Sequence, residues 1–170
     1  FDRIATSGHS MGAAAASAVA ADANIAAWFV MASPGFTNVD GKPILVMGGT
    51  SDAIATPASI RAAFDNLTAT PRRYVSIEGA GHLAFSDICL VARDKGGVLK
   101  LAEDYGIEIV DLLSMLGENG CRDTDLGPEK AFPIIGHYLV AHLRSAFGLD
   151  TGLTGFDEVA RACFGEAVAD

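Results

Sequence analysis

The sequence predicts an α/β fold built on a mostly parallel β-sheet. Short apolar stretches alternate with stretches that favour helix, in the order strand, helix, strand, strand, helix, strand. The apolar stretches are nearly continuous, as expected of strands that are buried on both faces of a parallel sheet. A chain of 170 residues is long enough for a domain with a proper core, so we expect residues 1–170 to form a single domain.

The first elements surround a glycine-rich turn. A short apolar strand is expected at residues 1–6, and an alanine-rich helix at residues 11–21. Two continuous apolar runs, at residues 25–32 and 42–47, then predict buried strands. The first of these runs ends at a Ser-Pro-Gly turn and the second at a pair of glycines, which are typical ends of strands.

The later elements begin with a helix start at Thr56 and Pro57. The threonine hydroxyl can cap the helix and proline fits its first position, so a helix is expected to run to Asn66. A fourth strand is expected at residues 73–77. Further helices are expected at residues 107–116, 129–147 and 156–164.

Composition excludes several kinds of partner. The 12 Lys and Arg residues are outnumbered by 21 Asp and Glu residues, and the net charge of -9 argues against nucleic acid or an anionic membrane. No stretch approaches the roughly 20 consecutive apolar residues of a membrane span. The cysteines Cys89, Cys121 and Cys163 lack metal-binding spacing, so we expect no metal and no cofactor. One pair of them could form a disulfide, which would indicate an oxidising compartment.

The turn after the first strand carries the pattern G-x-S-x-G, from Gly8 to Gly12. In this pattern a strained turn between a strand and a helix lifts a serine hydroxyl, here that of Ser10, above the end of the strand. Glycines are needed because the backbone is strained at the serine and because the strand and the helix approach closely. The alternative is a glycine-rich turn with no catalytic duty. The strand before the turn and the helix after it favour a nucleophile.

A serine nucleophile needs a base, and the base needs an acid that holds its tautomer. Asp52 and His82 each follow an apolar strand, which is where ligands bind in open α/β sheets. The order Ser, Asp, His is also the order that this turn type predicts. We therefore predict Ser10 as the nucleophile, His82 as the base and Asp52 as its partner. The backbone N–H of Met11, at the start of a helix, is the expected oxyanion donor.

Other acidic residues and histidines fit these roles less well. Asp40 precedes its strand and Asp65 lies within a helix, so both are expected at the surface. Asp87 lies five residues after the predicted base and could cap a helix. Packing or surface roles are expected for the remaining histidines: His9 behind the turn, and His137 and His142 on a long helix.

With these residues in place, the chain resembles the C-terminal half of an α/β-hydrolase. The segments GHSMGAAAA, KPILVMGGTSDAIATP and IEGAGHLAFSDIC resemble the nucleophile, acid and histidine segments of cutinase-like polyester hydrolases and of esterases related to dienelactone hydrolase. The similarity covers residues 1–89 well, and HYLVAHLRSAFG resembles the closing helix of these enzymes more loosely. The resemblance implies a serine carboxylester hydrolase that works through an acyl-enzyme.

The substrate site is expected to be apolar. Phe36 falls where such enzymes often place an aromatic residue beside the substrate, and a core position at the end of a strand is an equal alternative. Ile54 and Leu83 lie near the acid and the base, and would favour an acyl or aromatic substrate over a charged one. Two other classes stay open: an acyltransferase or peptidase that uses the same three residues, and a non-catalytic binding module derived from a hydrolase.

Residues 92–129 depart from the pattern of this family and are expected to form an insertion or a cap over the site. Cys89 and Cys121 bracket the region and are the favoured disulfide pair, with Cys163 free. A secreted or periplasmic location follows if this bridge forms.

The family's sheet has further strands before the nucleophile strand, and these carry the second oxyanion donor. The sheet predicted here is truncated before that strand, since Ser10 lies ten residues into the sequence. An exposed first strand is a template for a partner strand. We therefore expect a homo-oligomer, or a missing N-terminal half that completes the sheet.

Overall fold

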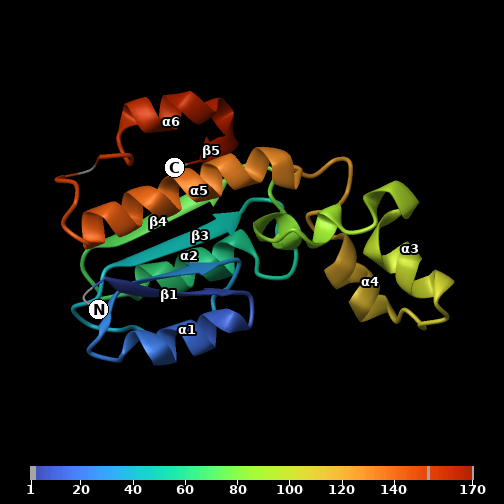
Figure 1. The fold of residues 1–170 in the computed structure, drawn as a ribbon, viewed down its shortest axis with the longest axis horizontal. Helices are drawn as coiled ribbons and strands as arrows, with labels where there is room; N and C mark the ends of the chain where they lie inside the picture. The colour runs from blue at the N-terminus through green and yellow to red at the C-terminus, as the bar shows by residue number, and fades with distance from the viewer. Residues whose placement is uncertain (1–2, 153, 170) are drawn as a thin grey trace.

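The computed structural model describes residues 3–152 and 154–169 (Figure 1). Four parallel strands lie side by side in the order of the sequence: β1 (Ile4–His9), β2 (Ile25–Met31), β3 (Ile44–Gly49) and β4 (Arg72–Ile77). A short strand, β5 (Val168–Ala169), pairs antiparallel with the end of β4. The predicted α/β fold with a mostly parallel sheet is confirmed.

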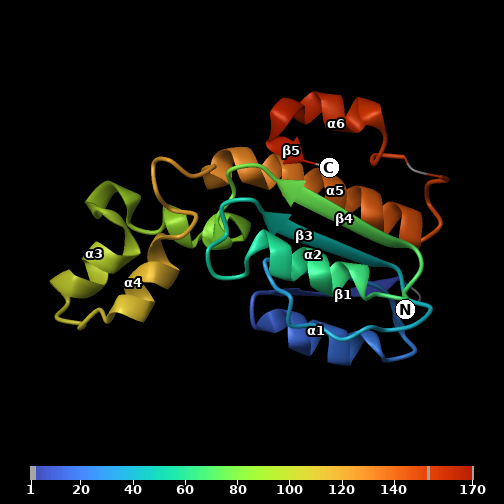
Figure 2. The same ribbon diagram turned by 180° about the vertical axis from the view of Figure 1, so that it is seen from behind.

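Helices cover both faces of the sheet. The helices α1 (Gly12–Ala20) and α2 (Pro57–Asp65) pack on one face, and α5 (Pro128–Ala146) packs on the other (Figures 1 and 2). The remaining helices are α3 (Gly97–Asp104), α4 (Asp111–Glu118) and α6 (Glu158–Phe164). Short 3-10 turns occupy His82–Phe85, Ile88–Leu90, Arg93–Lys95 and Gly165–Ala167. Figure 2 shows α3 and α4 together as a lobe beyond one end of the sheet.

The core lies on the two faces of the central strands. All the residues of β3 are buried, as expected of a strand that is covered by helices on both faces. On the face covered by α1 and α2, Trp28 and Ile60 are wholly buried. On the face covered by α5, Leu45 and Met47 pack against Ile134. This packing fixes the ends of the strands, and therefore the loops that follow them.

The first half of the chain follows the prediction closely. The Thr56 hydroxyl accepts a hydrogen bond from the backbone N–H of Ser59, with Pro57 at the first helical position, so the predicted cap is confirmed. The first strand was expected to end at residue 6, but its pairing with β2 continues to His9, which lies opposite Met31. The glycine-rich turn is therefore shorter than predicted.

The second half departs from the prediction at two elements. The helix expected at residues 107–116 begins at Asp111, and α3 was not predicted. The strand β5 was not predicted either, since two residues carry no readable periodicity. Within residues 3–152 and 154–169, no helix combines the length and apolar character needed to cross a membrane.

The first strand lies at the edge of the sheet. Its inner side pairs with β2, and in the part of the chain that the structure describes no strand pairs with its outer side. An unpaired edge presents free backbone N–H and C=O groups to another chain segment. A partner strand, from a second copy or from a preceding segment, remains a prediction.

His142 is wholly buried where α5 packs on the sheet. Its Nε2–H donates to the carbonyl oxygen of Trp28 at 3.1 Å, and its Nδ1 accepts from the Arg73 guanidinium at 3.2 Å. The contact with Arg73 requires a neutral ring, because a protonated Nδ1 could not accept a hydrogen bond. Burial, together with the charge of Arg73, lowers the pKa of His142 from 6.5 to about 4.

This histidine predicts a loss of stability in mild acid. Below pH 6.5 the unfolded chain binds a proton at His142 that the folded chain does not bind until about pH 4, so the free energy of unfolding falls as the pH decreases across that window. The expected contribution between pH 7 and pH 5 is about 2 kcal/mol. Urea unfolding at both pH values, for the native protein and for His142→Gln, measures this contribution. The glutamine amide can still donate to the Trp28 oxygen. The variant should lose less stability over the same interval, and equal losses would contradict the prediction.

Candidate active site

Ser10 occupies a strained turn between β1 and α1. Its φ of +54° lies in the left-handed region, which is unfavourable for a residue with a side chain. Its backbone N–H donates to the carbonyl oxygen of Met31 at 3.0 Å, which ties the turn to the end of β2. The strain and this anchor hold the hydroxyl above the end of the strand.

Gly8 explains why the strand and the helix can approach so closely. A Cβ atom at this position would lie 2.1 Å from the carbonyl oxygen of Gly12 and 2.6 Å from the backbone nitrogen of Ala13. Both atoms belong to the backbone of α1 and cannot rotate away. At Gly12 itself, an added Cβ would meet no atom within 4 Å, so the two glycines of the pattern differ in their need for space.

We therefore expect replacement by alanine to change the free energy of unfolding in opposite directions at the two glycines. Gly8→Ala should destabilise the protein by about 3 kcal/mol or more, because β1 and α1 must separate to admit the methyl group. Gly12→Ala should raise the free energy of unfolding by about 0.5–1 kcal/mol, because alanine favours a helix more than glycine does. Urea unfolding of the two variants provides the comparison. A Gly8→Ala protein as stable as the native protein would contradict the packing described here.

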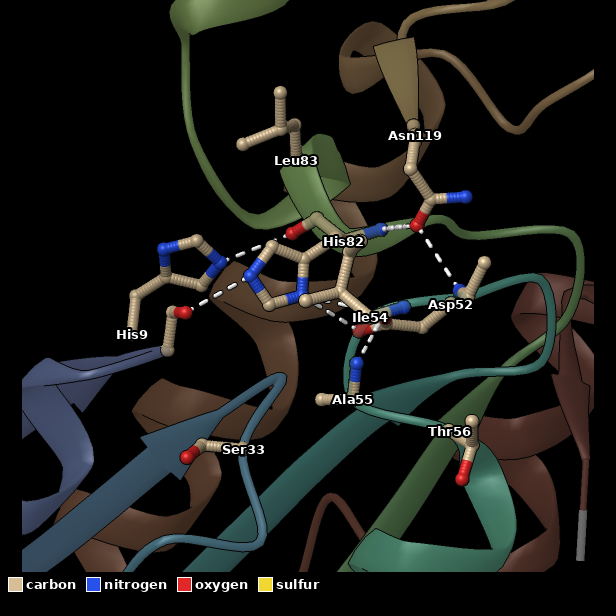
Figure 3. Close-up of polar contacts among 12 residues, drawn as sticks. His9, Ser33, Asp52, Ile54, Ala55, Thr56, His82, Leu83 and Asn119 are labelled. Atoms are coloured by element: carbon tan, nitrogen blue, oxygen red, sulfur yellow. Dashed lines mark hydrogen bonds and ion pairs between the residues drawn. The ribbon is translucent and has the colours of Figure 1, made fainter. Parts of the chain in front are cut away.

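His82 links the turn of Ser10 to the loop of Asp52. Its Nε2 lies 2.9 Å from the Ser10 hydroxyl, and its Nδ1 lies 3.0 Å from one carboxylate oxygen of Asp52 and 3.2 Å from the other. His82 and Asp52 are each 3% exposed. In this arrangement Nδ1–H donates to the carboxylate and Nε2 accepts from the hydroxyl. The structure thus brings the three predicted residues into one hydrogen-bonded chain (Figure 3).

The loop after β3 holds the Asp52 carboxylate in place. One of its oxygens, Oδ1, accepts hydrogen bonds from the backbone N–H groups of Ile54 and Ala55, both at 2.8 Å. The other oxygen, Oδ2, is the one nearer to His82. The carboxylate is therefore oriented by its own loop, with one oxygen assigned to the backbone and the other to the histidine.

His9 lies beside His82 rather than behind the turn, which corrects the sequence prediction. The two ring centroids are 5.1 Å apart, and the His9 Nε2–H donates to the carbonyl oxygen of His82 at 2.9 Å (Figure 3). Strand β1 extends to His9, so the side chain is placed at the site and not beneath it. Burial lowers the pKa of His9, which favours a neutral ring beside His82.

The role of Met11 as the oxyanion donor remains a prediction. It is the N-cap residue of α1, and its side chain is exposed. The first N–H groups of a helix have no acceptor within the helix, so they are available to a ligand. The positive end of the helix dipole favours a negative charge at the same place.

The three residues predicted to contact substrate have different surroundings. Phe36 packs edge-to-face on Trp28, with 6.0 Å between ring centroids, and adjoins the core cluster of α1 and α2. These contacts agree with the core position that the sequence analysis gave as the alternative for Phe36. Ile54 and Leu83 are half-buried next to Asp52 and His82, and their contact with substrate remains a prediction.

The competing residues have other roles in the structure. Asp40 accepts hydrogen bonds from Asn38 and Thr68 at the surface. Asp65 pairs with Arg61 on α2. Asp87 precedes a short 3-10 turn and makes no side-chain cap there.

Asn119 is the residue that sequence reasoning missed. It is 2% exposed, and its side chain lies between the loops that carry Asp52 and His82 (Figure 3). Two residues further on, Cys121 forms a disulfide with Cys89, which confirms the predicted pair, and Cys163 is free and exposed. No pattern of sequence marks the asparagine, because its partners are distant in the chain.

Comparison with solved structures finds a similar fold in an esterase. A solved ferulic acid esterase from Streptomyces cinnamoneus is similar with a TM-score of 0.59 at 22% identity, over 85% of this chain and 40% of the esterase. An alpha-beta serine hydrolase homologue from Coxiella burnetii is similar with a TM-score of 0.42 at 28% identity, over 48% of this chain and 41% of the homologue. This chain thus spans less than half the length of either protein. No curated protein sequence matches it. The alpha/beta hydrolase family profile matches residues 1–99, and the chain belongs to that family.

Proposed function

We propose that this chain carries the catalytic residues of a serine carboxylester hydrolase. The observation that carries the proposal is the hydrogen-bonded chain from Asp52 through His82 to Ser10, with the hydroxyl 2.9 Å from the imidazole Nε2. A serine hydroxyl becomes a strong nucleophile only when a base accepts its proton, and the position of His82 beside Ser10 supports this role for His82. We also propose that the chain is a single domain with an insertion at residues 92–129.

The reaction would begin with attack of the Ser10 oxygen on the ester carbonyl carbon. The hydroxyl proton passes to His82 Nε2, while the carbonyl oxygen gains negative charge and accepts from the Met11 N–H. The imidazolium then donates its proton to the departing alcohol, which leaves an acyl-enzyme. Water attacks this ester through the same base, and the acid is released as Ser10 recovers its proton.

The charges around His82 support this cycle. The imidazolium that forms lies 3.0 Å from the Asp52 carboxylate, and both groups are buried, where charges attract more strongly than in water. The lowered pKa of His9 keeps a second positive charge away from the imidazolium at neutral pH. The site therefore favours one protonated histidine, the one that exchanges a proton with the serine.

Ester substrates with apolar acyl groups are the class that we propose. The segments around Ser10, Asp52 and His82 resemble those of esterases, and Ile54 and Leu83 line the same loops with apolar side chains. The similar fold of the ferulic acid esterase makes aromatic esters a reasonable second set of substrates. The disulfide supports an oxidising compartment, such as the cell exterior or the periplasm.

Covalent labelling with a fluorophosphonate probe tests the proposal. The probe reacts with an activated serine, so the native protein should be labelled, and peptide mass spectrometry should place the label on Ser10. Hydrolysis of p-nitrophenyl butyrate should show a burst of nitrophenol equal to the labelled fraction, as expected of an acyl-enzyme. A native protein that is folded but neither labelled nor active would favour a non-catalytic module.

A further inference from the structure

We propose that Asn119 is a positioning residue that sets the relative placement of Asp52 and His82. The proposal rests on the function proposed above. Asn119 follows the last residue of α4, outside the sheet and its helices, and reaches both loops with one buried amide. The oxygen and the nitrogen of its side-chain amide both bond to the backbone of these loops.

The amide is bonded to the residues on both sides of Asp52. Its oxygen accepts from the backbone N–H of Ala53 at 3.1 Å, and its nitrogen donates to the carbonyl oxygen of Ser51 at 3.1 Å. The amide thus uses both its acceptor and its donor on the loop that carries Asp52. Asn119 therefore fixes the backbone from which the carboxylate projects.

The same residue is bonded to the backbone of the histidine loop. The amide oxygen that contacts Ala53 also accepts from the backbone N–H of His82 at 2.8 Å. The backbone oxygen of Asn119 accepts from the N–H of Leu83 at 2.8 Å. A single oxygen atom thus connects the two loops, and its position limits how far His82 can move from Asp52 (Figure 3).

Close packing and a covalent bond hold Asn119 where it is. A Cβ on Gly81 would lie 2.4 Å from the backbone nitrogen of Gly120, so the histidine loop and the segment that carries Asn119 touch through their backbones. The disulfide between Cys89 and Cys121 ties the same segment to the chain just after the histidine loop. The segment at residues 92–129 therefore supports the site from the side through Asn119, in addition to any role as a cover.

Few side chains can replace this amide. Alanine would leave the buried N–H groups of Ala53 and His82 without an acceptor, and the loops would relax. Ionised aspartate has the same shape and keeps an acceptor for both N–H groups, but it cannot donate to the Ser51 oxygen and places a buried negative charge beside that oxygen. Alanine therefore disturbs the loops by removing hydrogen bonds, and aspartate disturbs them by adding a buried charge.

The test compares Asn119→Ala and Asn119→Asp with a control variant, Leu67→Ala. Leu67 is buried after α2, at the end of the sheet where β4 begins, so its truncation should cost about 2–5 kcal/mol without a contact to either loop. For each folded protein, the rate constant for fluorophosphonate labelling of Ser10 is measured, with kcat and KM for p-nitrophenyl butyrate and the free energy of unfolding. Circular dichroism establishes that each variant is folded.

Asn119→Ala should lower kcat and the labelling rate constant by about 10- to 100-fold, with KM within about twofold, because small errors of alignment have large effects on the chemical step. Asn119→Asp should also lower kcat and the labelling rate constant, because the lost donor and the added buried charge displace the same loop. Leu67→Ala should lose stability but keep kcat. Native kcat and labelling in either Asn119 variant, or an equal loss of kcat in Leu67→Ala, would overturn the proposal. Absence of labelling in the native protein would instead refute the proposed function.

Discussion

Replacing Ser10 with alanine is expected to lower kcat for ester hydrolysis by about 10⁶-fold, the largest effect of the substitutions considered for this chain. The hydroxyl is the atom that forms the acyl-enzyme, and no neighbouring group in the described site replaces it. His82 would keep its bond to Asp52 but would have no proton to accept. Steady-state hydrolysis of p-nitrophenyl butyrate measures kcat, and fluorophosphonate labelling should vanish with it.

Ser7→Ala is the matched control for this substitution. Ser7 lies three residues earlier, on strand β1 just before the turn, and is exposed. This control also replaces a serine with alanine. It therefore reproduces any effect of that exchange on the stability of this part of the chain, while the site is left intact. The control should keep native kcat and stability. If Ser10→Ala hydrolyses the ester as fast as Ser7→Ala, Ser10 is not the nucleophile.

The strands of the sheet could be predicted because burial on both faces leaves a direct mark on sequence. The run that forms β3 is apolar throughout, and its residues are all buried. Thr56 and Pro57 marked the start of α2 for an equally local reason, since capping depends on neighbouring residues. Helix α3 left no such mark. It is eight residues long and has no buried residue, and none of its apolar side chains belongs to the core.

In the candidate site, too, the residues that follow a local rule could be predicted from the sequence and the others could not. Ser10, Asp52 and His82 each follow a strand, so a rule about strand ends was enough to find them. Asn119 reaches Ala53 across 66 residues and His82 across 37 residues, and no local rule joins positions that far apart. Its one local signal is the Asn-Gly-Cys sequence beside a disulfide cysteine, which predicts a turn and nothing more.

Asp52→Asn is expected to lower kcat/KM by about 10³- to 10⁴-fold without unfolding the protein. The reason lies in how the loop orients this side chain. The N–H groups of Ile54 and Ala55 both donate to Oδ1, so the amide oxygen of asparagine must take that place. Its NH₂ group then occupies the position of Oδ2, 3.0 Å from His82 Nδ1, and donates to it.

That donation would select the wrong form of the histidine. With Nδ1 accepting, the neutral ring carries its proton on Nε2, and Nε2 can no longer accept the proton of Ser10. Asp40→Asn is the control, because Asp40 is a surface carboxylate bonded to Asn38 and Thr68. Michaelis kinetics with p-nitrophenyl butyrate should show native kcat/KM for this control. Comparable activity of the two variants would mean that His82 does not depend on Asp52 for its tautomer, and the acid would have to be another residue.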